Sequence, residues 1–61
     1  MMYNVIFEVK EKTSILGETF EPDEDYVLHV EAPNPGEAKK DALRTLTQKY
    51  LIKDPKIKEI L

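Results

Sequence analysis

Asn34-Pro35-Gly36-Glu37 marks the clearest structural boundary in this sequence, because it supplies the residues that begin an α-helix. Asn34 offers a side-chain oxygen that can cap the first free N–H groups of a helix, and proline suits the first helical position. Glu37 stands at the third helical position, where a glutamate can complete a capping box. We therefore predict that a helix begins here.

Apolar residues recur at helical spacing after this start, at Ala38, Ala42, Leu43, Leu46 and Tyr50. Polar residues such as Lys40 and Gln48 fall on the opposite side, which is the pattern of a helix with one buried face. Pro55 cannot continue a helix and also restricts the residue before it. The helix is therefore expected to end near residues 51–53.

Two segments before the helix alternate apolar and polar side chains, as strands with one buried face do. Residues 3–9 place Tyr3, Val5, Phe7 and Val9 at every second position, and residues 26–32 do the same with Tyr26, Leu28, Val30 and Ala32. After the helix, residues 56–61 alternate with apolar residues on both sides. This last segment is expected to be a short strand, with a terminal helical turn as the alternative.

These elements predict a single small α+β domain over residues 1–61, with the order β-β-α-β. The three strands are expected to form an antiparallel-type sheet with the first strand in the centre, which is strand order 2-1-3. One helix covers about one face of such a sheet, so the other face stays open. Ile6, Val27, His29 and Ile60 are expected on this open face. Its apolar members indicate a contact with a second copy or another protein, although single exposed apolar residues are also common.

Residues 11–25 join the first two strands and are too long for a tight two-residue hairpin loop. We expect a long β-hairpin arm that turns near Leu16-Gly17 and carries an acidic segment at Glu21, Asp23, Glu24 and Asp25. The arm also carries Ile15, Leu16 and Phe20. These three are candidate partner-binding residues, unless the arm folds back over the sheet and covers them.

The composition argues against several classes of protein. The chain carries 12 acidic and 9 basic residues, a net charge of -3 at pH 7, without the basic excess of a typical nucleic-acid binder. It has no cysteine, which excludes disulfides, thiolate zinc sites and a cysteine nucleophile. No apolar run approaches the ~20 residues that span a bilayer, and the N-terminal segment lacks the basic start of a signal peptide. A cytoplasmic protein is expected.

No motif in the chain predicts catalysis. His29 is the only histidine, and it stands between Val27 and Glu31 without a second metal ligand or a serine in a recognisable motif. The acidic segment lacks the ligand order of an EF-hand loop. There is no glycine-rich phosphate loop and no nucleophile elbow. We expect a protein that is not an enzyme and holds no metal or other cofactor.

Charge is unevenly distributed along the chain. Residues 1–35 carry two basic and eight acidic residues, a net charge of -6, whereas residues 36–61 carry seven basic and four acidic residues, a net charge of +3. The basic half suggests an alternative function, the binding of nucleic acid through its phosphates. The candidate residues are Lys39, Lys40, Arg44, Lys53, Lys56 and Lys58. Ion pairs on the helix surface are the simpler explanation of the same charges.

Three segments resemble the start of HicB-type antitoxins: Tyr3-Asn4-Val5-Ile6-Phe7-Glu8, Tyr26-Val27-Leu28-His29-Val30, and Gln48-Lys49-Tyr50-Leu51 at the helix end. The resemblance implies an antitoxin-like regulatory protein as part of the alternative function. The chain lacks the Pro-Gly-Cys segment and the Gly-x-Thr element that such proteins place between the second strand and the helix, so antitoxin activity itself is not assigned. In topology, size and acidic arm, the chain also looks like small phage-encoded inhibitors that imitate DNA.

The expected function is that of a protein-binding module, as a small phage-type or accessory inhibitor or regulator. We expect it to act as a homodimer through the open sheet face, while the acidic hairpin arm docks on a larger protein. The candidate partner-binding residues are Ile6, Val27, His29, Ile15, Leu16 and Phe20.

Overall fold

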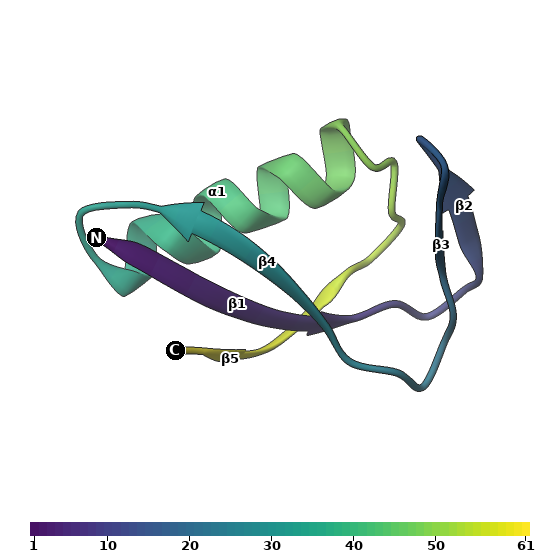
Figure 1. Ribbon diagram of the computed structural model, residues 1–61, viewed down its shortest axis with the longest axis horizontal. Helices are drawn as coiled ribbons and strands as arrows, with labels where there is room; N and C mark the ends of the chain where they lie inside the picture. The colour runs from purple at the N-terminus through teal and green to yellow at the C-terminus, as the bar shows by residue number, and fades with distance from the viewer.

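The computed structural model describes residues 1–61 and places one helix against one face of a three-stranded sheet (Figure 1). The elements in chain order are β1 (Met2–Glu8), β2 (Thr13–Ile15), β3 (Glu18–Phe20), β4 (Tyr26–Glu31), α1 (Pro35–Gln48) and β5 (Lys56–Ile60). The sheet order is β4-β1-β5, and both outer strands run antiparallel to β1. β2 and β3 form a separate hairpin. The predicted α+β fold, the central first strand and the long hairpin arm are confirmed, and the last segment is a strand.

The register between β1 and β4 assigns alternate side chains to the two faces of the sheet. Val5 pairs with Leu28, and both pack into the core that α1 covers. The next pair, Ile6 with Val27, therefore points to the other side. We call this uncovered side of the three-stranded sheet the open face.

A β-bulge in β5 changes which of its residues face α1. Phe7 pairs with Ile57 and Val5 pairs with Ile60, so one extra residue of β5 lies between the two pairs. The extra residue brings both isoleucines to the helix side, where they pack against the buried core. The prediction that Ile60 lies on the open face is wrong, because simple alternation along residues 56–61 takes no account of a bulge.

The start of α1 follows the prediction from the sequence. Asn34 caps the helix, because its Oδ1 accepts a hydrogen bond of 2.9 Å from the Glu37 N–H, and proline occupies the first turn. The buried stripe consists of Ala38, Ala42 and Leu46, all of which are 0% exposed. Two alanines in this stripe let the helix lie close to the sheet. No helix in the structure has both the length and the apolar character needed to cross a membrane.

The end of α1 differs from the prediction, since the helix stops at Gln48. Leu51 adopts a left-handed backbone conformation with φ 55°, which turns the chain away from the helix axis. The Ile52 N–H then donates a hydrogen bond of 2.8 Å to the Leu46 carbonyl, and the Ile52 side chain is buried. The helix therefore ends well before Pro55, and the chain turns back so that Ile52 joins the core.

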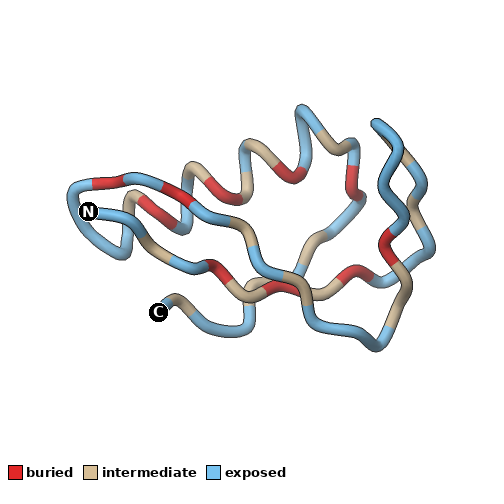
Figure 2. Tube along the Cα trace, in the orientation of Figure 1, coloured by how far each residue is buried: buried red, intermediate tan, exposed pale blue.

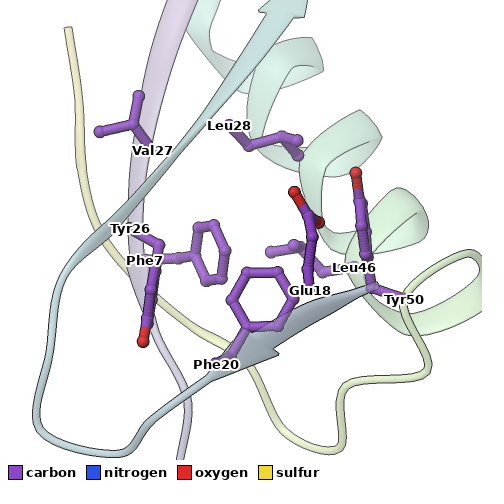
Figure 3. Close-up of a pocket in the computed structure, with 8 residues that line it drawn as sticks. All are labelled: Phe7, Glu18, Phe20, Tyr26, Val27, Leu28, Leu46 and Tyr50. Atoms are coloured by element: carbon purple, nitrogen blue, oxygen red, sulfur yellow. The ribbon is translucent and has the colours of Figure 1, made fainter. Parts of the chain in front are cut away.

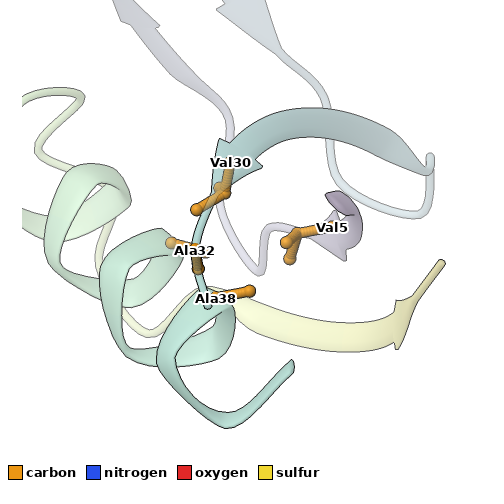
Figure 4. Packing of buried hydrophobic residues seen from close by; sticks show 5 residues of the cluster. Val5, Val30, Ala32 and Ala38 are labelled. Carbon is orange, nitrogen blue, oxygen red and sulfur yellow. The ribbon is translucent and has the colours of Figure 1, made fainter. Parts of the chain in front are cut away.

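The core consists of two neighbouring clusters between the sheet and α1 (Figure 2). The first cluster contains Val5, Val30, Ala32, Ala38 and Ala42, four of which are labelled in Figure 4. The second contains Phe7, Val9, Phe20, Leu46 and Ile52. The second cluster therefore includes a residue of the hairpin arm as well as residues of the sheet and the helix.

The hairpin arm turns where the sequence predicts, at Leu16 and Gly17, with φ 52° and 76°. Both values are positive, as a tight two-residue hairpin turn requires. Phe20, at the end of β3, is only 8% exposed and packs with Phe7. The arm folds back over the sheet at this residue. Of the two alternatives for the arm, the structure therefore shows the one that folds back and covers Phe20, while partner binding by Phe20 stays a prediction.

Candidate functional site

The open face carries apolar side chains that α1 leaves in water. We call Met2, Ile6, Val27 and Leu61 the open-face band. Met2 and Leu61 are each 61% exposed and Val27 is 51% exposed, while Ile6 is half-buried. Leu61 joins this face because it exchanges two backbone hydrogen bonds of 2.8 Å with Asn4. The expected placement of Ile6 and Val27 on an uncovered face is confirmed.

Ion pairs lie beside the open-face band, near the first residues of β5. Lys58 Nζ lies 2.8 Å from Asp25 Oδ1 and 4.0 Å from Glu8 Oε2, and Lys56 Nζ lies 3.7 Å from Glu8 Oε1. The hydrogen bond to Asp25, together with the negative charges of Asp25 and Glu8, raises the pKa of Lys58 above its ordinary value of 10.5. Lys58 of β5 thus pairs with a residue of β1 and with the residue that precedes β4.

His29 also lies on the open face, opposite Asn4 of β1. Its Nδ1 donates a hydrogen bond of 2.7 Å to the Oδ1 of Asn4, its cross-strand partner. No group of three or more histidine, aspartate and glutamate side chains in the structure could hold a metal ion. His29 is exposed and paired to a neutral amide, so it contributes a polar contact to this face.

The tip of the hairpin arm exposes one large apolar side chain. Leu16 is 64% exposed and adopts a backbone conformation that favours glycine or asparagine. Ile15 beside it is half-buried. Of the three arm residues predicted to bind a partner, Leu16 is therefore the most exposed.

The acidic segment between β3 and β4 makes separate local contacts. Glu21 pairs with Lys12 at 3.4 Å, and Glu24 Oε2 accepts a hydrogen bond of 3.0 Å from the Tyr26 hydroxyl. The same hydroxyl accepts a hydrogen bond of 2.6 Å from the Glu21 N–H. Tyr26 thereby holds the return of the arm against β4. The carboxylates of this segment do not converge on a common centre.

The six basic residues of the alternative function are not brought together. Lys40 lies 3.8 Å from Glu37 and Arg44 lies 2.9 Å from Asp41, both on the exposed side of α1. Lys56 and Lys58 pair with carboxylates across the sheet, as described above. Lys39 and Lys53 form no ion pair in the structure. Four of the six positive charges are therefore partly neutralised. Two of these ion-paired residues lie on the surface of α1, and the other two lie on the open face of the sheet.

The structure also contains a pocket that the sequence analysis missed. It has a volume of about 170 Å³ and opens between β3, β4 and the end of α1 (Figure 3). Its lining residues are Phe7, Glu18, Phe20, Tyr26, Val27, Leu28, Leu46 and Tyr50. We call it the aromatic pocket, because four of these eight residues carry aromatic rings.

Phe20 is the centre of the aromatic cluster at this pocket. Its ring centroid lies 5.9 Å from that of Phe7, 5.0 Å from that of Tyr26 and 5.7 Å from that of Tyr50. The contacts with the two tyrosines are edge-to-face, at 82° and 84°. The rings come from β1, β3, β4 and the turn after α1. No local sequence pattern shows that segments so far apart in the chain meet.

Glu18 is the only charged residue that lines the aromatic pocket. Its carboxylate forms no ion pair and no side-chain hydrogen bond within the chain. Figure 3 shows the carboxylate and the Tyr50 hydroxyl directed toward the same side of the pocket. Glu18 and Phe20 stand two positions apart in β3, so their side chains share one face of the strand. This spacing is the one sequence signal that points to the pocket.

Comparison with known proteins found no matching family model, no matching curated protein and no matching solved structure.

Proposed function

We propose that this protein is a non-enzymatic protein-binding module that forms a homodimer through its open face and serves as a small regulator or inhibitor. The observation that carries the proposal is the open-face band, whose members Met2, Val27 and Leu61 are 51–61% exposed. Burial of such side chains against an apolar partner stabilises a complex by about 25 cal/mol for each Å² removed from water. Because α1 covers only one side of the sheet, a partner that covers the other side can gain this stabilisation.

A second copy of the chain suits this face because a two-fold axis that runs across the strands brings the open-face bands of two copies together. The lysines beside the band are paired with carboxylates of the same chain, Lys56 with Glu8 and Lys58 with Asp25, so these charges are balanced within each copy. Such a contact is self-complementary, as a two-fold interface requires.

The hairpin arm is the proposed docking element for a larger protein. Leu16 stands at its tip, largely exposed, in a left-handed conformation that is unfavourable for a leucine. The backbone conformation of Leu16 costs the folded monomer free energy, and its apolar side chain gains no burial in return. A contact with another molecule would give this side chain a role.

Sedimentation equilibrium over a range of protein concentrations tests the homodimer. The double variant Ile6→Thr with Val27→Thr keeps branched side chains that suit strands, and replaces the ethyl group of Ile6 and one methyl group of Val27 by hydroxyls. We expect its dimer dissociation constant to rise on the order of tenfold or more. The control Leu16→Asn alters an exposed apolar residue off this face and is expected to leave the dimer unchanged. A wild-type chain that stays monomeric at every concentration would contradict the proposal.

Affinity capture from the native host tests the arm. Wild-type protein and Leu16→Asn are used as baits side by side, with folding checked by circular dichroism. A partner that the wild-type bait retains and the variant loses supports docking through the tip. Identical retention by the two baits contradicts it.

A further inference from the structure

The aromatic pocket lies beside an edge of the sheet that has no neighbouring strand. β4 pairs with β1 only, so its outer edge is free. Three consecutive residues of this strand, Tyr26, Val27 and Leu28, line the pocket. The Val27 side chain points to the opposite side of β4 from Leu28 (Figure 3). At Val27, the main chain of the strand therefore lines the pocket. Free main-chain groups and a side-chain pocket therefore occur together.

The size of the pocket limits what can enter it. Pockets for drug-sized molecules measure about 300–1,000 Å³, whereas this one measures about 170 Å³. That volume suits one side chain rather than a whole small molecule. A free strand edge next to a pocket for a single side chain is the arrangement by which proteins bind extended peptides, in which main-chain hydrogen bonds provide affinity and the pocket selects the side chain.

The chemistry of the lining indicates which side chain fits. Aromatic faces attract cations, and Lys49 Nζ already lies 5.6 Å from the centroid of the Tyr50 ring. The carboxylate of Glu18 has no partner within the chain, and a purely apolar occupant would remove water from it without compensation. A guanidinium group has an apolar face for a ring and a fork of donors for a carboxylate. The surrounding half of the chain, residues 1–35, carries a net charge of -6, which favours a basic segment.

We propose that the free edge of β4 binds an extended basic segment of a partner protein, and that this segment places an arginine side chain in the aromatic pocket with its guanidinium against Glu18. This inference rests on the proposed role in protein binding, but the pocket lies on the helix side of the sheet, whereas the homodimer uses the open face, and Val27 is the one residue that belongs to both. Self-association and peptide binding are therefore measured separately.

Nuclear magnetic resonance titration with synthetic peptides tests the proposal. The probe is a blocked peptide of alternating threonine and valine with one central arginine, added to uniformly ¹⁵N-labelled protein. We expect chemical-shift changes at the amides of Glu18, Leu28 and Tyr50. The same peptide with norleucine in place of arginine keeps the strand-forming residues but lacks the charge, and we expect it to bind about fivefold more weakly. A peptide with proline beside the arginine loses a main-chain donor and is also expected to bind more weakly.

Variants of the protein locate the contact. Glu18→Gln removes the charge with little change in shape and is expected to weaken binding of the arginine peptide about fivefold. Glu11→Gln removes an exposed carboxylate from the same acidic half of the chain and serves as the matched control, with an expected change of less than about twofold. Tyr50→Leu keeps an apolar side chain but removes the ring, and is expected to weaken binding to a similar extent as Glu18→Gln. The dispersion of the amide spectrum shows whether each variant is folded.

Three results overturn this inference. The first is equal binding of the arginine and norleucine peptides. The second is equal binding by wild-type protein and Glu18→Gln. The third is a titration with no shift changes, or with changes confined to the open-face residues Met2, Ile6 and Leu61. None of these results bears on the sedimentation of the wild-type protein, which alone decides the homodimer.

Discussion

Phe20 of β3 meets Tyr26 of β4 edge to face, with ring centroids 5.0 Å apart and ring planes at 82°. The two residues stand at opposite ends of the acidic segment, so their contact closes it into a loop. The Tyr26 hydroxyl strengthens the closure because it accepts a hydrogen bond from the Glu21 N–H and donates one to Glu24. The hairpin arm is thereby anchored to the sheet at its base, while Leu16 at its tip stays exposed.

Substitution of Phe20 tests how much this anchor contributes to the stability of the whole domain. Phe20→Ala leaves a cavity next to Phe7 and Tyr26, and we expect the free energy of unfolding to fall by about 3 kcal/mol. A domain of this length has a total stability on the order of 3–9 kcal/mol, so the substitution is expected to remove about a third or more of it. Urea denaturation followed by circular dichroism measures the change.

Two further variants keep this test decisive if Phe20→Ala does not fold. Phe20→Leu retains most of the apolar volume and is expected to lose about 1 kcal/mol. Leu16→Ala alters a side chain that is 64% exposed, and its effect is expected to stay within about 0.5 kcal/mol. An equal loss in Phe20→Leu and Leu16→Ala would show that the arm is not anchored through Phe20.

The turn of the hairpin arm can be made more stable by one substitution. Leu16 and Gly17 both have positive φ, and Asn-Gly is the preferred pair for such a turn. We expect Leu16→Asn to raise the free energy of unfolding by about 0.5–1 kcal/mol, because asparagine tolerates the left-handed conformation better than leucine does. Urea denaturation of the variant beside the wild type measures the gain.

The neighbouring glycine provides the control of opposite sign. A Cβ atom added at Gly17 would meet nothing within 4 Å, so Gly17→Ala tests the backbone conformation alone. Its φ of 76° is unfavourable for alanine, and we expect a loss of about 1 kcal/mol. A destabilised Leu16→Asn would instead show that the Leu16 side chain contributes to the folded monomer.

The fold could be predicted from the sequence where one short pattern determines one element. The period of two in β1 and β4 predicts which side chains face α1, and Asn34 with Pro35 predicts the start of the helix. The turn at Leu16-Gly17 could be placed because a glycine interrupts an otherwise strand-like arm. These features depend on neighbouring residues, so the sequence alone contains enough information.

The features that the sequence did not predict depend on residues far apart in the chain. Ile60 faces α1 only because β5 bulges against β1, and the cost of that bulge is offset by burial of an isoleucine that simple alternation would leave in water. Phe20 is buried by residues of β1 and β4 and of the turn after α1. The aromatic pocket exists only when these segments meet, so residues 11–25 alone could suggest either an exposed arm or one that folds back.

The ion pair between Lys58 and Asp25 predicts how stability changes in alkaline solution. The hydrogen bond and the charge of Asp25 raise the pKa of Lys58 in the folded protein above 10.5, the ordinary value that the unfolded chain retains. The stabilisation is fully present below pH 10.5, where Lys58 is protonated in both states. It is lost as the pH rises through the higher folded pKa, because the ammonium then loses its proton in the folded state as well.

Comparison of wild-type protein with Lys58→Met measures this loss. We expect the difference in their midpoints of urea denaturation to be constant at neutral to mildly alkaline pH and to shrink as the pH rises above 10.5. Lys53→Met removes a lysine that forms no ion pair, so its small difference from wild type is expected to stay constant over the same range. Added salt at neutral pH is expected to reduce the Lys58→Met difference as well, since the pair is solvent-exposed. A Lys58→Met difference that is the same on both sides of pH 10.5 would show that the pair with Asp25 does not stabilise the fold in solution.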